Sequence, residues 1–455
     1  MRLRTNFSPS AAISAAVLLA GFVFSLAANW PGHLSYDSVI QLLEGRTGAY
    51  ADWHPPVMSW LLGVGDAIVP GAALFVLFDT LLVFASLLSL LLINAKPSWW
   101  AAPVALLCVL MPQFLLYPGI VWKDVLFACA GVAGFACLAQ AANRWTNPPL
   151  RLALIAGMLV LLVLAALARQ NGVIVLISGV AALTWIAARK GKEGHVLREA
   201  AVHGGGALIG AAALIGAAYA GLSMHFVGNS GPAKQIQLLE EYDIIGAVAA
   251  EPGLSLPVIA RSDPMLEKLI RTIGVRVYSP ERNDTLTNSH VLTAALNNDD
   301  PAMIGAQWRA LIARHPWLYL RVRADVFRWV FLTPDLKMCL PYLVGVSGAP
   351  QEMAELGLKP RWDDRDDALD AYAGALVGTP ALSHAMFGLL AALLLVFLLR
   401  RRRPPDIAVA FLLIGATGFA LSFFVISIAC DYRYLYFLDL SALAAAFYVS
   451  LEPRL

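Results

Sequence analysis

Apolar runs of about 20 residues recur along most of the chain, and they restrict its possible folds more than any other feature. A run of this length crosses a membrane as a helix, because a helix satisfies its backbone polar groups internally. The composition agrees, since 59% of the 455 residues are hydrophobic and 14% are charged, whereas soluble chains are closer to a quarter charged. We therefore predict an all-α polytopic membrane protein.

About ten transmembrane helices are predicted. They cover residues 10–29, 71–94, 98–117, 123–142, 151–168, 171–188, 200–222, 381–399, 406–429 and 434–451. The first run is longer than the apolar part of a signal peptide, so we expect it to remain as a span. The stretch 54–70 is also apolar, but it holds Asp66 and has prolines near both ends. Counting it as a span would place the Arg400–Arg403 run outside, so we predict a helix lying on the outer membrane surface.

Basic residues orient these spans, because lysine and arginine favour the cytoplasmic side. Both chain ends are then expected in the cytoplasm, with the protein in the inner (cytoplasmic) membrane and its functional loops outside. The expected organisation is an N-terminal transmembrane module (1–222), a mixed extracytoplasmic segment (223–375) and C-terminal transmembrane helices (376–455).

Charge and cysteine content exclude some functions. The net charge is +2 and no basic tract with interleaved aromatics occurs, so we expect no nucleic-acid partner. The five cysteines are scattered, and four lie in apolar runs where cysteine acts as a small hydrophobe. Their spacing predicts neither a zinc site nor a disulfide framework.

Two polar motifs follow the first predicted span. In "SYDS", Asp37 stands where a carboxylate can take a proton from a hydroxyl or amine nucleophile. The alternative is that Asp37 caps a helix. In "WHPP", two prolines start a helix and hold His54 at its beginning. His54 then binds a phosphate or assists a proton transfer, or it is an ordinary loop histidine.

Three further motifs fall on the same predicted face. "WKDVLF" places Lys123 and Asp124 at a helix start. Lys123 is expected to contact a phosphate, and Asp124 to orient a substrate or bind a metal. The alternative is that Asp124 caps the helix while Lys123 snorkels toward the membrane surface. In "LARQNG", Arg169 interrupts an apolar region and is expected to pair with a lipid phosphate, Asp37 or Asp124, unless the motif is a simple turn. "DYRYLY" offers Arg433 as another phosphate contact, although its tyrosines also fit an aromatic belt.

Together these motifs suit one task, which is to hold an anionic lipid headgroup and remove a proton from an acceptor. In the order of its parts the chain resembles the GT-C class of integral-membrane glycosyltransferases, which use polyprenyl-phosphate sugars. The class includes protein O-mannosyltransferases and aminoarabinose transferases, and bacterial members of unassigned substrate look closest. The resemblance covers about residues 1–190, through "SYDS", "DWHPP", "KDVLF" and "RQNG".

The resemblance implies a GT-C-like fold and a membrane glycosyltransferase with Asp37 as general base and Asp124 positioning the acceptor or a metal. Residues that would contact the donor phosphate or shape the site are His54, Lys123, Arg169, Asn171, Tyr36 and Gln41. The implied partners are a polyprenyl-phosphate-linked sugar donor, a lipid, glycan or protein acceptor, and membrane lipids. No cofactor is certain, and a divalent metal is left open because metal dependence varies across the class.

Two departures leave the substrates open. A single aspartate stands where protein mannosyltransferases carry an Asp-Glu pair, and "RQNG" replaces a lysine-containing turn of the aminoarabinose enzymes. Other functions also remain: a lipid-linked polysaccharide polymerase or ligase, whose large outer segment would carry the chemistry, a transporter or flippase of lipid-linked saccharide, and a non-catalytic membrane subunit. Transporters place charges near mid-membrane and often show repeats, whereas here the acids lie at span boundaries.

Overall fold

The computed structural model describes residues 8–51, 53–191, 195–223 and 231–454. Within these ranges the chain forms helices and isolated β-bridges but no extended strand. It divides into two compact units. Unit 1 comprises residues 1–227, 342–420 and 435–455, and unit 2 comprises residues 228–341 and 421–434.

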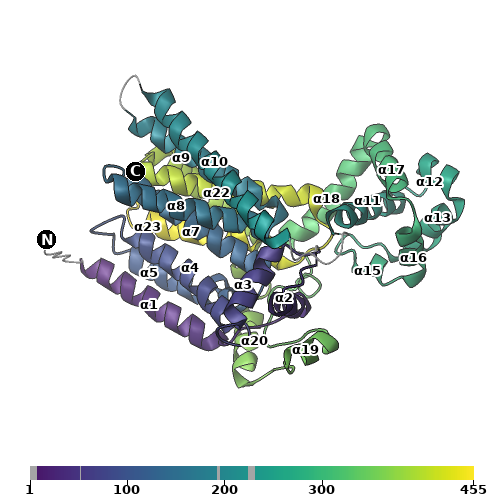
Figure 1. Cartoon of the computed structure of the whole chain (residues 1–455), viewed down its shortest axis with the longest axis horizontal. Helices are drawn as coiled ribbons and strands as arrows, with labels where there is room; N and C mark the ends of the chain where they lie inside the picture. Colours follow the sequence, from purple (N-terminus) through teal and green to yellow (C-terminus); the bar gives the residue numbers. More distant parts are fainter. Residues whose placement is uncertain (1–7, 52, 192–194, 224–230, 455) are drawn as a thin grey trace. The chain divides into compact units, whose positions relative to one another are not determined.

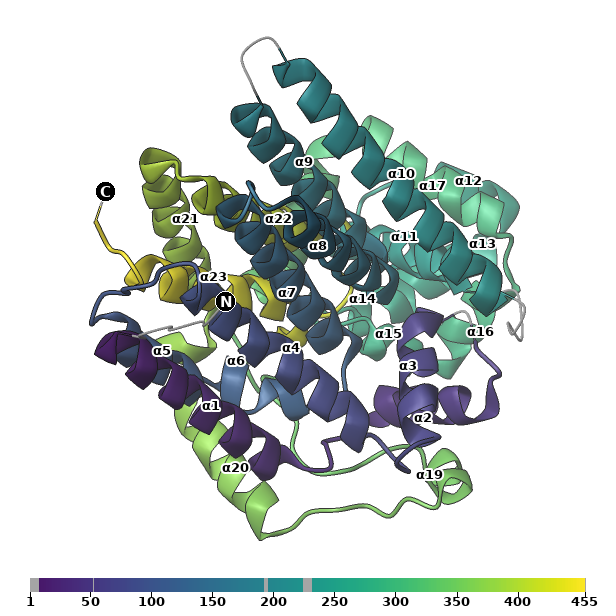
Figure 2. The same cartoon turned by 60° about the vertical axis from the view of Figure 1, so that its left-hand side comes forward.

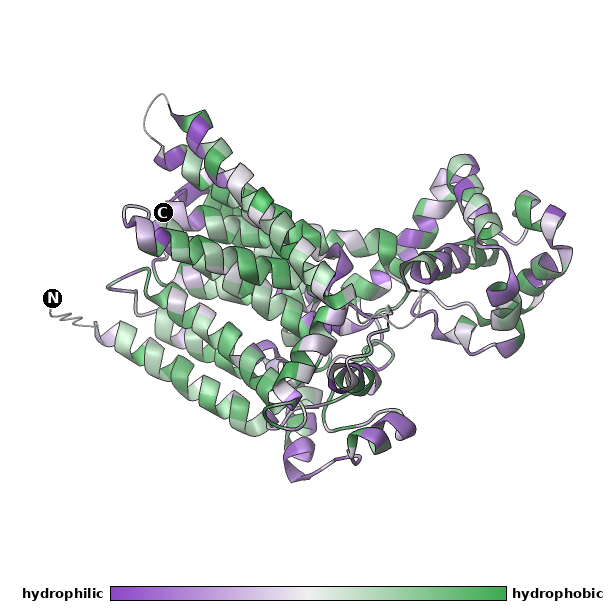
Figure 3. Cartoon of the chain, in the orientation of Figure 1, coloured by the Kyte–Doolittle hydropathy of each residue, from purple (hydrophilic) through white to green (hydrophobic). Residues whose placement is uncertain are grey.

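Eight helices among the described residues are long and apolar enough to cross a membrane. They are α1 (Pro9–Asn29), α4 (Ala73–Leu91), α7 (Lys123–Asn143), α8 (Pro148–Ala168), α9 (Val173–Lys190), α10 (Val196–Ser223), α21 (His384–Arg401) and α22 (Pro404–Ile426). Figure 1 shows the long helices of unit 1 running side by side, and Figure 3 colours most of their residues as hydrophobic. The prediction of an all-α polytopic membrane protein is confirmed.

Two predicted spans differ from straight crossings. The run 98–117 forms α5 (Ala101–Leu110), α6 (Pro112–Leu115) and η1 (Tyr117–Gly119), bent by 73° at the break. Pro112 explains the break, because proline cannot continue a preceding helix. The last predicted span is α23 (Tyr436–Ser450), whose 15 residues are shorter than a full crossing.

Unit 1 has two distinguishable ends. The Ser10 hydroxyl at the start of α1 donates to the Pro97 carbonyl (2.7 Å), and the Ser98 amide donates to the Leu451 carbonyl (2.8 Å). Helix α1 therefore begins, and α23 ends, at the same end of the bundle. The start of α7 lies at the opposite end, because His33, just past α1, exchanges backbone hydrogen bonds with Gly119 and Val121.

Two short helices follow α1 at this opposite end. They are α2 (Tyr36–Thr47) and α3 (Pro56–Asp66), which lie beside each other in Figures 1 and 2. Helix α3 contains 11 residues, too few to cross a hydrocarbon core. The stretch 54–70 is thus a short helix and not a span, as predicted.

The segment after residue 341 also belongs to unit 1. Isolated bridges join Leu34 to Val346 and Val346 to Arg361. This segment carries α19 (Pro350–Leu356), α20 (Asp364–Leu376) and η4 (Pro380–Leu382). The Leu356 carbonyl accepts a hydrogen bond from Arg46 of α2 (2.9 Å), so the segment holds α2 on a second side.

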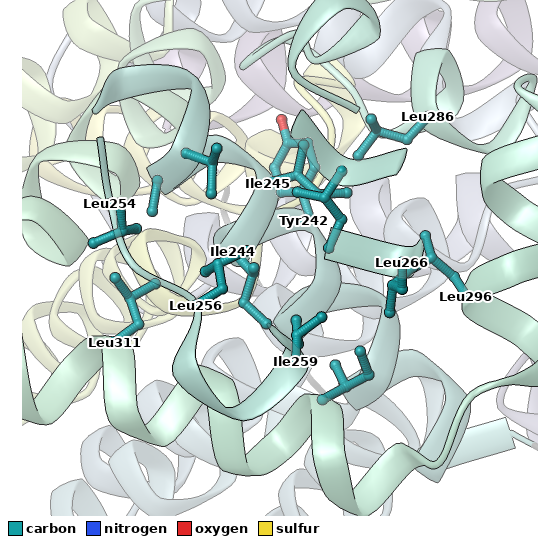
Figure 4. Close-up of a cluster of buried hydrophobic side chains, with 14 of the residues drawn as sticks. Tyr242, Ile244, Ile245, Leu254, Leu256, Ile259, Leu266, Leu286, Leu296 and Leu311 are labelled. Atoms are coloured by element: carbon teal, nitrogen blue, oxygen red, sulfur yellow. The ribbon is translucent and has the colours of Figure 1, made fainter. Parts of the chain in front are cut away.

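Unit 2 is helical in its described part, where we expected a mixed segment. Its helices are α11 (Gly231–Ala250), α12 (Pro257–Ser262), α13 (Pro264–Leu269), η3 (Ile270–Gly274), α14 (Val275–Val277), α15 (Asp284–Thr287), α16 (His290–Asn298), α17 (Pro301–Arg314) and α18 (Pro316–Leu332), and η5 (Tyr432–Leu435) begins in it. Figure 4 shows side chains of its apolar core, including Tyr242, Ile245 and Ile259.

Two polar features of unit 2 were not predicted. Arg323 of α18 is fully buried, donates to Asp243 (2.9 Å) and also bonds the Phe424 and Ser427 carbonyls. Cys339 and Cys430 form a disulfide across 91 residues. The prediction that the cysteines form no disulfide framework is therefore wrong for this pair, because spacing along the chain does not report proximity in space.

Candidate active site

Asp37 lies in the first turn of α2 with its side chain one-third exposed. Ser35 occupies the N-cap position, and its amide donates to the Ser38 hydroxyl (3.1 Å). The Ser38 hydroxyl in turn donates to the Val121 carbonyl (2.6 Å). The alternative reading of Asp37 as the helix cap is thus wrong. A carboxylate in this first turn interacts favourably with the positive end of the helix dipole.

His54 connects Asp37 to Lys123. The imidazole is buried, with Nε2 3.9 Å from Asp37 Oδ1 and Nδ1 3.3 Å from Lys123 Nζ. An ammonium group only donates hydrogen bonds, so Nδ1 acts as the acceptor and we assign the imidazole proton to Nε2. That proton then faces the Asp37 carboxylate. The 3.9 Å separation is longer than a hydrogen bond, as catalytic contacts often are without substrate.

Lys123 and Asp124 begin α7. Trp122 occupies the N-cap position, so Asp124 is not the cap that the alternative reading required. The Asp124 side chain is almost fully buried, and its Oδ1 lies 2.5 Å from an Arg169 guanidinium nitrogen. Because Lys123 and Asp124 are adjacent, the Asp37–His54–Lys123 series and the Asp124–Arg169 pair meet at one helix start.

Arg169 follows the last residue of α8 in an extended conformation (φ −139°, ψ 132°), before the short helix η2 (Gln170–Gly172). The extended backbone ends α8 and directs the chain into α9. Of the partners that the sequence left open for Arg169, the structure shows Asp124.

The remaining candidates are placed differently. Tyr36 is exposed at the start of α2, and Asn171 lies in η2 two residues after Arg169. Gln41 is buried one turn after Asp37, and no described residue hydrogen-bonds its Nε2. Arg433 belongs to unit 2, where it pairs with Asp431 (3.1 Å). The structure thus brings Asp37, His54, Lys123, Asp124 and Arg169 together in unit 1.

Sequence reasoning missed Glu44. Its buried carboxylate accepts hydrogen bonds from the Ser59 hydroxyl (2.6 Å) and the Ala51 amide (3.2 Å). Burial raises the pKa of Glu44 above its usual value. Glu44 therefore holds both the loop before His54 and the first turn of α3. The signal was present in the sequence, because Glu44 is seven residues after Asp37 and thus two helical turns along the same face.

No group of three or more histidine, cysteine, aspartate or glutamate side chains that could hold a metal ion occurs among the described residues. We refer to Asp37, His54, Lys123, Asp124 and Arg169 as the cluster. Within it, the buried carboxylate of Asp124 already faces the cation of Arg169. The chemistry proposed below therefore uses side chains alone and assigns no ligands to a metal.

No family model matches this chain, and no curated protein matches it. Its structure is similar to that of the oligosaccharyltransferase AglB from Archaeoglobus fulgidus in complex with an inhibitory peptide and a dolichol-phosphate. The identity is 17% and the TM-score 0.43, over 96% of this chain and 50% of that one. A second structure of the Archaeoglobus fulgidus enzyme, in complex with zinc and sulfate, has 16% identity and a TM-score of 0.44. The match covers 95% of this chain and 48% of that one.

The apo structure of ArnT from Cupriavidus metallidurans also matches, with 14% identity and a TM-score of 0.34, over 97% of this chain and 78% of that one. AglB and ArnT are GT-C glycosyltransferases, the class that the sequence resembles. This chain spans about half the length of the archaeal enzymes.

Proposed function

We propose that this protein is a GT-C-type membrane glycosyltransferase that moves a sugar from a polyprenyl-phosphate donor to a lipid, glycan or protein acceptor. The observation that carries the proposal is the series Asp37–His54–Lys123, with contacts of 3.9 Å and 3.3 Å. It puts a carboxylate suited to proton removal and a cation suited to phosphate binding on either side of one imidazole.

The proposed reaction is an in-line displacement that inverts the configuration at the anomeric carbon of the sugar. The acceptor oxygen or nitrogen forms a bond to the anomeric carbon while the bond from that carbon to the phosphate oxygen breaks. Asp37 takes the acceptor proton, and the bonding electrons leave with the polyprenyl phosphate. Lys123 and Arg169 neutralise the charge that develops on the phosphate. The imidazole between Asp37 and Lys123 orients the carboxylate and separates it from the departing anion.

Asp124 has a positioning role in this scheme. Its 2.5 Å contact holds the Arg169 guanidinium at the start of α7, next to Lys123. A buried arginine without a counter-charge would be costly near lipid. Asp124 thus lets the site keep two cations close together before the donor arrives.

We further propose that the cluster faces the extracytoplasmic side. The basic-residue pattern supports this orientation. Disulfides persist mainly in oxidising compartments, so the Cys339–Cys430 bond supports an extracytoplasmic place for unit 2.

The proposal is tested with purified protein in proteoliposomes. Polyprenyl-phosphate donors carrying different radiolabelled sugars are supplied with a membrane extract as the acceptor source. We expect one donor to release free polyprenyl phosphate with equal transfer of label to an acceptor. Movement of the intact donor across the bilayer without cleavage would contradict the proposal and favour a transporter.

A further inference from the structure

Helices α2 and α3 touch through their backbones at Gly45 and Gly63. A Cβ added to Gly45 would lie 2.6 Å from the Gly63 nitrogen, and one added to Gly63 would lie 2.9 Å from the Gly45 Cα. Cβ atoms do not approach backbone atoms this closely, so any larger residue at either position must separate the helices. Only two glycines allow the observed crossing.

Side chains on both sides of this contact hold it in place. Glu44, the neighbour of Gly45, accepts a hydrogen bond from Ser59 of α3 (2.6 Å). Arg46, on the other side, makes two hydrogen bonds to Asp66 at the end of α3 (2.8 and 2.7 Å). These bonds fix the angle between the helices as well as their distance.

The reacting groups lie away from this contact, Asp37 in the first turn of α2 and His54 in the loop just before α3. Asp37 precedes Gly45 by eight residues, and His54 precedes Gly63 by nine. At a helical rise of about 1.5 Å per residue, the arm from Gly45 to Asp37 is about 12 Å long. A small rotation or separation of the helices at the glycine contact therefore changes the 3.9 Å distance between Asp37 and His54.

We propose that Gly45, Gly63 and Glu44 are positioning residues that set the Asp37–His54 distance for glycosyl transfer. The inference rests on the proposed function for its catalytic consequence, while its geometric part concerns this chain alone. A misplacement of about 1 Å in an enzyme site can cost about 100-fold in rate. The glycine contact therefore controls turnover from a position that touches no substrate.

The test compares Gly63→Ala with Gly65→Ala on the same helix. A Cβ at Gly65 would meet the Leu74 Cβ at 3.4 Å, an ordinary contact. Both changes raise helix propensity equally, which makes Gly65→Ala a matched control. We expect Gly63→Ala to lower kcat about 10- to 100-fold with little change in KM for the donor, and Gly65→Ala to retain wild-type kinetics.

Glu44→Gln provides a second variant if Gly63→Ala folds poorly. It keeps the side-chain size but loses an acceptor oxygen, so it should lower kcat without altering donor KM. Equal kinetics in Gly63→Ala and Gly65→Ala would overturn the inference. So would a fall in kcat that only follows the fraction of folded protein, as judged by thermal melting, because that result indicates a purely structural role.

A distance measurement separates this inference from the proposed function. Spin labels at Tyr36→Cys and Trp53→Cys, next to Asp37 and His54, report the gap without any substrate, in a background whose free cysteines Cys108, Cys129 and Cys137 are alanine. We expect the distance distribution to shift in Gly63→Ala and to stay unchanged in Gly65→Ala. An unchanged distribution in both overturns the inference even if wild-type protein transfers sugar. A shift without any sugar transfer contradicts the proposed function alone.

Discussion

Lys123 Nζ lies 3.3 Å from His54 Nδ1, across a sequence separation of 69 residues. The contact joins the start of α7 to the loop before α3, and through His54 it reaches Asp37. An ammonium and a carboxylate are thereby held on opposite nitrogens of one buried ring. In the proposed reaction, this arrangement allows Lys123 to bind the donor phosphate while Asp37 takes the proton of the acceptor.

Replacing Lys123 should weaken donor binding. We expect Lys123→Met to raise KM for the polyprenyl-phosphate donor about 10- to 100-fold, because a hydrogen bond to a charged group contributes about 1.5–3 kcal/mol. Lys123→Arg keeps the charge and should lose less. Steady-state kinetics with varied donor concentration measures both, and an unchanged KM in Lys123→Met would exclude Lys123 from phosphate binding.

Removing the Asp124 charge should destabilise the bundle. Asp124→Asn leaves the Arg169 guanidinium mostly buried without a counter-charge, and breaking such a pair costs about 3–5 kcal/mol. We expect a clear fall in the thermal midpoint in detergent, with partial recovery in the double variant Asp124→Asn, Arg169→Gln. If the double variant is less stable than either single change, the two side chains do not act as a pair.

Acid should weaken the attachment of the 342–363 segment through His33. The buried His33 Nδ1 accepts from the Gly345 amide (3.0 Å), which it can do only when that nitrogen carries no proton. Burial and then the Arg361 charge lower the pKa of His33 from 6.5 to about 4, although Asp366 opposes the shift. The unfolded chain therefore takes up the proton first as the pH falls. The contribution of neutral His33 to the free energy of unfolding is therefore fully present above pH 6.5. It falls by about 3 kcal/mol as the pH approaches 4.

The control for His33 is His33→Gln, whose amide can accept from Gly345 and donate to Asn29 but does not titrate between pH 4 and pH 6.5. Thermal unfolding from pH 7 to pH 4 should show a smaller loss of stability in this variant than in wild type. The same pH dependence in both proteins would exclude His33 as the responsible group.

The Cys339–Cys430 disulfide should stabilise unit 2. Removing it with Cys339→Ser and Cys430→Ser is expected to cost about 2–4 kcal/mol, since the bond closes a long loop. Limited proteolysis of the 228–341 region measures the effect. Mass spectrometry of the wild-type protein, alkylated without reductant, should show both cysteines unmodified, and their alkylation under those conditions would contradict the bond.

The spans could be predicted from the sequence because a membrane demands long apolar helices with internal hydrogen bonds. The bend at Pro112 was also visible in principle, since proline interrupts a helix. The disulfide was not, because nothing in the spacing of Cys339 and Cys430 shows that 91 intervening residues return to the same place. The burial of Arg323 likewise depends on Asp243, which lies on a different helix.

The residues of the candidate site could be predicted from the sequence, but the contacts between them could not. Short polar motifs between apolar runs pointed to Asp37, His54, Lys123, Asp124 and Arg169, because charges near lipid are costly and are therefore informative. The sequence left three partners open for Arg169, and the choice of Asp124 required the fold. The sequence places Glu44 on the same helix face as Asp37, but its hydrogen bond to Ser59 and the Gly45–Gly63 contact depend on how α2 crosses α3.

The measurement that tests the central claim most directly is the transfer rate of Asp37→Asn, compared with Glu355→Gln on α19 as an exposed acidic control. Both proteins are reconstituted at equal folded concentration with the donor that wild type uses. We predict that Asp37→Asn loses transfer by about 10²- to 10⁴-fold while still binding the donor, because the acceptor proton has no base, and that Glu355→Gln retains wild-type activity. Wild-type turnover in Asp37→Asn would contradict the account.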